Sequence, residues 1–77
     1  MTNTLDQKGK EAIEELFQLI EKEGYTLSDR IEFENDQRSV IQVMDNEAEY
    51  SDEKFLYESY SAYDIFDWLK MKGYLTK

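Results

Sequence analysis

The first third of the chain repeats apolar residues at the spacing of one helical face. Five apolar residues recur every three or four positions: Ala12, Ile13, Leu16, Phe17 and Ile20. Thr4 and Gln7 have the spacing of a capping box at the start of this pattern. Gly24 follows the pattern where a left-handed C-terminal cap would lie. We therefore predict a helix over residues 5–23.

After Gly24 the apolar period changes from that of a helix to that of a strand. Residues 30–34 alternate polar and apolar side chains, which directs Ile31 and Phe33 toward the core. Residues 35–37 read Asn-Asp-Gln and form a turn signal. Residues 38–44 return with β-branched side chains that suit a central strand. The two segments predict an antiparallel hairpin.

The segment after this hairpin fits more than one assignment. A second turn at residues 45–48 would lead into a third strand that begins near Glu49 and Tyr50, while residues 54–59 also have strand composition. A helix that starts at Asp52, with Ser51 as its cap, is the alternative. Strand and helix therefore both remain open for residues 52–60.

The last element is a helix with signals at both ends. Ser61 and Asp64 have the spacing of an N-terminal cap, and Gly73 is placed to end the helix after Lys72. Four apolar residues form one stripe between these signals: Ala62, Ile65, Phe66 and Leu69. The predicted fold is one α+β domain over residues 1–77, in the order helix, three antiparallel strands, helix.

Composition removes most catalytic chemistry from consideration. The 77 residues include no His, no Cys and no Pro, and the three Gly do not form a phosphate-binding loop. The chain thus lacks the usual general base, a thiol nucleophile and the commonest zinc ligands. A chain of this length buries only about 60% of its unfolded surface, which leaves no room for a deep cleft. We predict a protein that is not an enzyme and uses no metal or other cofactor.

The sequence also predicts that the protein stays in the cytoplasm. No run approaches the roughly 20 apolar residues that a membrane-spanning helix needs. Residues 1–10 are too polar for the apolar part of a signal peptide. We therefore expect no membrane partner.

Acidic charge is concentrated in the middle of the chain. Eighteen acidic and nine basic residues give a net charge of −9, and residues 29–67 alone carry a net −9. Such a surface repels nucleic acid and anionic lipid, and it attracts basic proteins with a strength that falls as salt rises. We expect a basic protein partner and no direct nucleic-acid binding. The alternative is that the charge serves only solubility.

Tyrosines are interspersed with these acids between residues 49 and 67. Tyrosine supplies large contact area in protein interfaces, and carboxylates can receive Lys and Arg from a partner. Five residues are candidate contacts on this basis: Tyr50, Glu58, Tyr60, Asp64 and Asp67. Tyr57 and Tyr63 suit the core as well as a contact surface. Trp68 lies off the apolar stripe of its helix and suits the edge of the core or a contact, of which we favour the core.

Carboxylates on strands and a helix lie several Å apart, which is comparable to the spacing of phosphates along a nucleic-acid strand. A protein with this surface can mimic nucleic acid and occupy the Lys and Arg side chains that normally hold phosphates. An acidic protein of the adaptor or immunity type would bind a basic partner without such mimicry. Composition does not separate these two classes.

Residues 16–27 run from an amphipathic helix into Tyr-Thr-Leu, and residues 40–50 form an acidic turn that is closed by Glu-Tyr. These two stretches resemble a family of small acidic phage inhibitors, the type II-A anti-CRISPR proteins, which block an RNA-guided DNA nuclease. The matching positions are Tyr25, Thr26, Val43, Glu49 and Tyr50. This chain departs from the family pattern at Glu47 and Ala48, where the hairpin turn lacks a glycine, and over residues 51–61.

The resemblance implies a helix, a three-stranded sheet and a C-terminal helical region, with no chemistry performed. It implies that the protein fills the basic groove where the nuclease reads a short duplex motif, inside the host-cell cytoplasm. Arg side chains read that motif, and carboxylates compete for them. The leading contacts by position are Asp45, Asn46, Glu47 and Glu49. Monomer and dimer both remain open.

Overall fold

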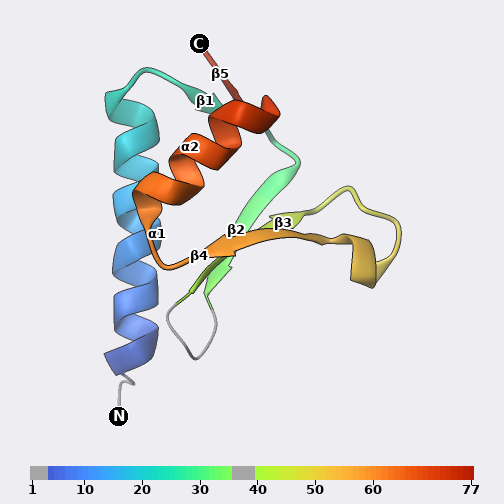
Figure 1. The fold of residues 1–77 in the computed structure, drawn as a ribbon, viewed down its shortest axis with the longest axis horizontal. Coiled ribbons are helices and arrows are strands. Elements are labelled where there is room, and N and C mark those ends of the chain that lie inside the picture. Colours follow the sequence, from blue (N-terminus) through green and yellow to red (C-terminus); the bar gives the residue numbers. More distant parts are fainter. Residues whose placement is uncertain (1–3, 36–39) are drawn as a thin grey trace.

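The computed structural model describes the backbone of residues 4–35 and 40–77, and the side chains of residues 10–35 and 40–77. The helices are α1 (Thr4–Lys22), the 3-10 turn η1 (Ser51–Glu53) and α2 (Ala62–Lys72). The strands are β1 (Thr26–Leu27), β2 (Ile31–Asn35), β3 (Ile41–Asp45), β4 (Phe55–Ser59) and β5 (Leu75–Thr76). Strands β2, β3 and β4 form an antiparallel sheet in that order (Figure 1). The α+β class and the order helix, three strands, helix are confirmed.

Both long helices end at the predicted glycines and in the same geometry. Gly24 and Gly73 have φ angles of 79° and 82°, in the left-handed region. The backbone amides of Tyr25 and Tyr74 each donate to the carbonyl five residues earlier, at 3.0 and 2.9 Å. This is the hydrogen bond of a Schellman motif, which satisfies a carbonyl left free by the end of a helix. The repeated Gly-Tyr pair therefore ends each helix and turns the chain toward the core.

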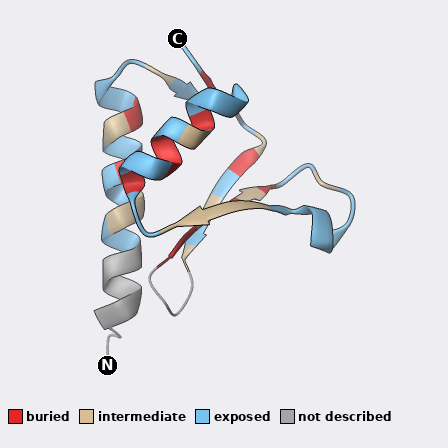
Figure 2. Cartoon of the chain, in the orientation of Figure 1, coloured by how far each residue is buried: buried red, intermediate tan, exposed pale blue. Residues whose placement is uncertain are grey.

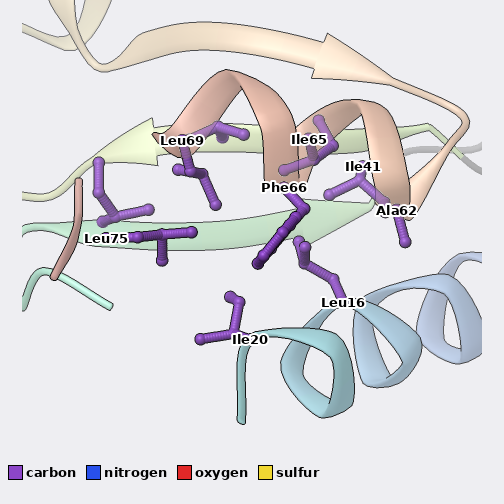
Figure 3. Close-up of a cluster of buried hydrophobic side chains, with 10 residues drawn as sticks. Leu16, Ile20, Ile41, Ala62, Ile65, Phe66, Leu69 and Leu75 are labelled. Atoms are coloured by element: carbon purple, nitrogen blue, oxygen red, sulfur yellow. The ribbon is translucent and has the colours of Figure 1, made fainter. Parts of the chain in front are cut away.

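The core lies between the two helices and one face of the sheet. Its buried residues come from α1, β2, β3, α2 and β5, as Figures 2 and 3 show: Leu16, Ile20, Ile31, Ile41, Val43, Ala62, Ile65, Phe66, Leu69 and Leu75. The predicted stripe of α2 is thus confirmed in full. The Ser61 hydroxyl accepts from the Asp64 amide at 3.3 Å, which confirms the predicted cap of this helix.

Both helices cover the same face of the sheet. The ring of Phe33 on β2 meets Phe17 of α1 edge-on, with centroids 5.3 Å apart. The ring of Tyr57 on β4 stacks on Trp68 of α2 at 4.9 Å. Phe33 and Tyr57 are both paired with Val43 of the central strand, so they point to one side. The side chains that alternate with Phe33 along β2 and with Val43 along β3 point to the opposite side of the sheet.

Strand β4 contains an irregularity that changes which of its side chains face the core. Val43 lies opposite Tyr57, but Met44 lies opposite Phe55, so Leu56 is an extra residue in the ladder. Leu56 and Tyr57 both pack against the core, although they are neighbours in sequence. Phe55 is turned to the opposite face as a result.

The third strand begins later than the position near Glu49 and Tyr50 that the sequence pattern suggested, and that prediction is wrong. Strand β3 ends at Asp45, whose amide donates to the Lys54 carbonyl at 2.7 Å. Residues 49–53 therefore have no strand opposite them with which to pair. The strand composition of residues 54–59 is confirmed, and the alternative helix from Asp52 is present only as the single turn η1.

The two-residue strands β1 and β5 were not predicted. They pair antiparallel, with Thr26 opposite Thr76 and Leu27 opposite Leu75. Two residues are too few to show an alternating pattern, so only the tertiary structure reveals this sheet. It ties the end of the chain to the segment after α1.

Two predicted features fall outside what the structure describes. The side chains of Thr4 and Gln7, which form the proposed capping box, precede the described side chains, although the helix itself begins at Thr4. The tip of the β2–β3 hairpin, with most of its predicted turn and the start of its second strand, falls at residues 36–39.

Candidate protein-interaction surface

The β3–β4 connection is held at its base by Asp45. The carboxylate of Asp45 accepts from Nη2 and Nε of Arg30 at 2.8 and 3.2 Å, and from the Glu47 amide at 3.0 Å. The Arg30 guanidinium, followed by the Glu47 amide, lowers the pKa of Asp45 below its usual range. Only 7% of Asp45 is exposed. Asp45 was predicted to contact a partner, but its carboxylate is directed at Arg30. The role of Asp45 is therefore to fix the connection in place.

The other four predicted contacts on this connection are exposed: Asn46, Glu47, Glu49 and Tyr50. The Asn46 side chain donates to the Asp29 carbonyl at 2.8 Å, which ties the connection to the segment before β2. The Tyr50 side chain is 60% exposed and precedes η1. Figure 1 shows this connection on the side of the molecule away from α1, and Figure 2 shows it as a mostly exposed stretch.

Three predicted contacts follow β4 in the chain, one at the corner after it and two on α2. Tyr60 is 66% exposed at the corner that joins β4 to α2. Asp64 accepts from the Tyr57 hydroxyl at 2.9 Å, and this hydrogen bond raises the pKa of Tyr57. Asp67 is exposed, with Lys70 at 3.9 Å. The predicted contacts thus form two groups separated by the length of β4 rather than one cluster (Figure 1).

The face of the sheet that is opposite the helices, which we call the open face, adjoins the first of these groups. Strand register places six side chains on it in two rows: Glu32, Met44 and Phe55 in one, and Glu34, Gln42 and Glu58 in the other. Of these, only Glu58 was among the predicted contacts. The row with Phe55 borders the β3–β4 connection, since Lys54 directly precedes Phe55 and Asp45 directly follows Met44.

The sequence pattern indicates some of the other residues of this face but not all of them. Alternation along residues 30–34 directs Ile31 and Phe33 inward, so it already implies that Glu32 and Glu34 point outward. No sequence signal identifies Phe55, because the extra residue Leu56 reverses the expected alternation of β4.

Two of the ambiguous aromatic residues are now placed. Tyr57 packs against the core and Tyr63 is exposed. Trp68 is half-buried at the edge of the core, between Tyr57 and Tyr74, which confirms its core assignment.

A shallow hollow of about 170 Å³ lies between α1 and the start of α2. It is lined by Glu15, Gln18, Leu19, Lys22 and Tyr63. Pockets that enclose small ligands usually measure about 300–1,000 Å³, so this hollow is smaller than such a pocket.

Within the described residues, no three acidic side chains converge as a metal site would require. No described helix is long and apolar enough to cross a bilayer.

The chemistry that these surfaces offer is the binding of cations by carboxylates, combined with apolar and aromatic contact. Glu47 and Glu49 provide charge on the connection, while Glu32 and Glu34 provide it on the open face. No protein-family model matches the chain, and no curated protein or solved structure is significantly similar to it.

Proposed function

We propose that the protein is an acidic inhibitor that binds a basic nucleic-acid-binding protein and occupies the groove in which that protein holds nucleic acid. One observation carries the proposal: the open face adjoins the β3–β4 connection at Met44 and Phe55, and both the face and the connection carry exposed carboxylates. Glu32 and Glu34 lie on the face, and Glu47 and Glu49 lie on the connection.

The spacing of these carboxylates supports mimicry of a phosphate chain. Glu32 and Glu34 are two residues apart on one strand, which separates their Cα atoms by about 6.6 Å at a rise of ~3.3 Å per residue. A Lys or Arg that holds a phosphate can hold a carboxylate at the same site. Binding then releases counterions from the acidic surface, so the affinity falls as salt rises.

We further propose an RNA-guided CRISPR nuclease as the partner, and a phage or mobile genetic element as the source. The resemblance to type II-A anti-CRISPR proteins motivates this choice. Two of its matching positions, Glu49 and Tyr50, are exposed on the connection, while Val43 is buried in the core. The inhibitor would act in the host cytoplasm by excluding DNA and would perform no chemistry.

Order of addition in a DNA-cleavage assay tests this proposal. We expect the protein to inhibit a type II-A nuclease loaded with its guide RNA when it is added before the target duplex, and to inhibit much less when it is added afterwards. Raised salt should weaken the inhibition, and excess duplex containing the short recognition motif should compete with the protein. Inhibition that is independent of the order of addition, or absent altogether, would contradict the proposal.

Paired charge variants refine the test. We expect Glu47→Gln with Glu49→Gln to weaken inhibition, because both carboxylates lie on the connection. The matched control is Glu14→Gln with Glu15→Gln, which removes the same charge from the exposed side of α1. Equal losses from the two pairs would show that net charge alone governs binding.

The exposed tyrosines favour a second candidate function, an adaptor or immunity-type protein that binds a basic partner without mimicking DNA. Tyr50 and Tyr60 lie at opposite ends of β4 with most of their side chains in solvent. Ordinary interfaces concentrate their binding energy in a few aromatic or Arg residues. If Tyr50→Ala or Tyr60→Ala abolishes binding while the Glu pairs have no effect, this second function replaces mimicry.

A further inference from the structure

The open face of the sheet carries an apolar pair, unlike a face that is simply solvated. Met44 on the central strand lies directly opposite Phe55 on β4, and Phe55 is 47% exposed. Side chains that face each other across two strands have Cβ atoms about 4.5–5.5 Å apart, so these two form one apolar contact surface. Glu32 lies on the other side of Met44, and Glu34 lies in the next row.

We propose that the open face binds a single amphipathic helix of a basic partner protein. One or two apolar side chains of this helix contact Met44 and Phe55, while its Lys or Arg side chains reach Glu32 and Glu34. This inference rests on the proposed function in one respect, that the partner is a basic protein.

The dimensions of the face suit one helix. Three strands span two inter-strand spacings of about 4.8 Å, which makes the face roughly 10 Å wide, close to the diameter of an α-helix with its side chains. On the other face of the sheet, α2 packs against β3 and β4, and the ring of Trp68 stacks on Tyr57 of β4. A partner strand would instead pair with a sheet edge, where free backbone groups are available.

Charge selects the class of partner. Glu32 and Glu34 are exposed on the face, and the whole chain carries a net charge of −9. A second copy of the chain would place these carboxylates against carboxylates, and nucleic acid would place phosphates against them. Only a positively charged occupant gains from both the apolar pair and the acidic side of the face.

The two kinds of contact have different consequences. Exposed carboxylates steer a basic partner and make association sensitive to salt. The apolar pair supplies the desolvated centre where interface energy is concentrated, and the flexible thioether of Met44 adapts to the side chain that it meets. Loss of Met44 or Phe55 should therefore slow association little and speed dissociation.

A designed peptide tests the surface on the full-length protein. The probe is a helix-forming peptide of about 18 residues with Leu on one face and Lys on the other, long enough to be helical when bound. The comparison peptide has the same composition, scrambled so that its Leu residues share no face. We expect the amphipathic peptide to bind more tightly and to perturb the NMR amide signals of β2, β3 and β4 more than those of α1.

Substitutions then locate the contact. We expect Phe55→Ala and Met44→Ala each to raise the Kd of the amphipathic peptide about tenfold, as for a side chain at the centre of an interface. The matched control is Met71→Ala, which removes a side chain that is 78% exposed on α2. Glu32→Gln with Glu34→Gln should weaken binding more at low salt than at high salt, relative to Glu14→Gln with Glu15→Gln.

The inference is wrong if the scrambled peptide binds equally well, if the amide perturbations lie on α1, or if Phe55→Ala and Met44→Ala behave like Met71→Ala. Thermal unfolding of each variant is the check that it remains folded.

The nuclease assay separates this inference from the proposed function. Peptide binding at the open face without nuclease inhibition would reject that function alone. Nuclease inhibition unaffected by Phe55→Ala and Met44→Ala would reject the surface alone.

Discussion

The guanidinium of Arg30 and the carboxylate of Asp45 meet through two hydrogen bonds, Nη2 to Oδ2 at 2.8 Å and Nε to Oδ1 at 3.2 Å. This contact joins the residue before β2 to the last residue of β3. Parallel hydrogen bonds of this kind fix direction as well as distance. The connection that presents Glu49 and Tyr50 is thus anchored by an acid that does not itself face a partner.

Replacement of Asp45 tests this anchoring role. We expect Asp45→Asn to lower the Tm at neutral pH, because it removes the charge that pairs with Arg30. The pKa of Asp45 is below its usual value of about 3.9, so its contribution to stability is present above that pH and is lost as the pH falls through the lowered pKa. The Tm difference between the two proteins should therefore narrow in acid, as measured by circular dichroism.

The control for this prediction is Asp52→Asn, on the exposed turn η1. It should leave the Tm nearly unchanged at neutral pH, since exposed single charges contribute little. A Tm difference for Asp45→Asn that stays constant from neutral to acid pH would show that the side chain acts through shape rather than charge.

The contact between Tyr57 and Asp64 predicts a spectroscopic titration. Asp64 raises the pKa of the Tyr57 hydroxyl above its usual value of about 10. Trp68 is the single tryptophan of the chain and stacks on Tyr57, so ionisation of Tyr57 should quench its fluorescence. We expect Asp64→Asn to shift the quenching midpoint to lower pH, because the carboxylate that accepts the phenol hydrogen bond is gone, and its negative charge with it.

Two further variants identify the group that titrates. Tyr57→Phe should remove this quenching step, which assigns the step to Tyr57 and not to the other ring that stacks on Trp68, that of Tyr74. Asp67→Asn removes an exposed charge from the same helix and should leave the midpoint in place. An unchanged midpoint in Asp64→Asn would mean that the hydrogen bond does not persist in solution.

The helices and the hairpin are predictable from the sequence because local chemistry specifies them. Gly24 and Gly73 mark the helix ends through backbone geometry that other residues adopt only at a cost. Ser61 marks the start of α2 through its hydroxyl. Each of these signals acts over a few residues, so a reading of the sequence alone can identify it.

The candidate site was less predictable because it depends on pairing between distant segments. The role of Asp45 is decided by Arg30, which lies 15 residues earlier. The direction of Phe55 is decided by the extra residue Leu56, which only the register with β3 reveals. Charge counting therefore locates the acidic residues in the chain but does not divide them between residues that stabilise the fold and residues that face solvent.

The cap of α2 predicts a measurable loss of stability. We expect Ser61→Ala to lower the free energy of unfolding by about 1 kcal/mol, the usual cost of removing a hydroxyl cap. The Asp64 amide would lose the acceptor that it now meets at 3.3 Å. Urea denaturation measures the change, and Ser51→Ala is the control, since η1 has Tyr50 at its cap position with no side-chain hydrogen bond. Equal effects of the two variants would show that the cap contributes nothing.

Substitution of Gly73, at the end of α2, measures the cost of backbone strain without a contribution from packing. A Cβ added at Gly73 would meet no atom within 4 Å, so substitution there costs only what the φ angle of 82° imposes. A left-handed residue other than glycine costs roughly 1–2 kcal/mol, so we expect Gly73→Ala to lower the free energy of unfolding by about that amount. Asparagine tolerates this region better, and Gly73→Asn should therefore cost less than Gly73→Ala.

Gly24, with a φ angle of 79° and equally open surroundings, is the matched position at the end of α1. If strain alone decides the cost, alanine at Gly24 and alanine at Gly73 should destabilise the protein by similar amounts in the same urea titration. A much smaller cost at Gly73 would indicate that the last turn of α2 and strand β5 rearrange together. The short β1–β5 sheet should then loosen, and faster hydrogen exchange at the amide of Leu75 or Thr76 would report it.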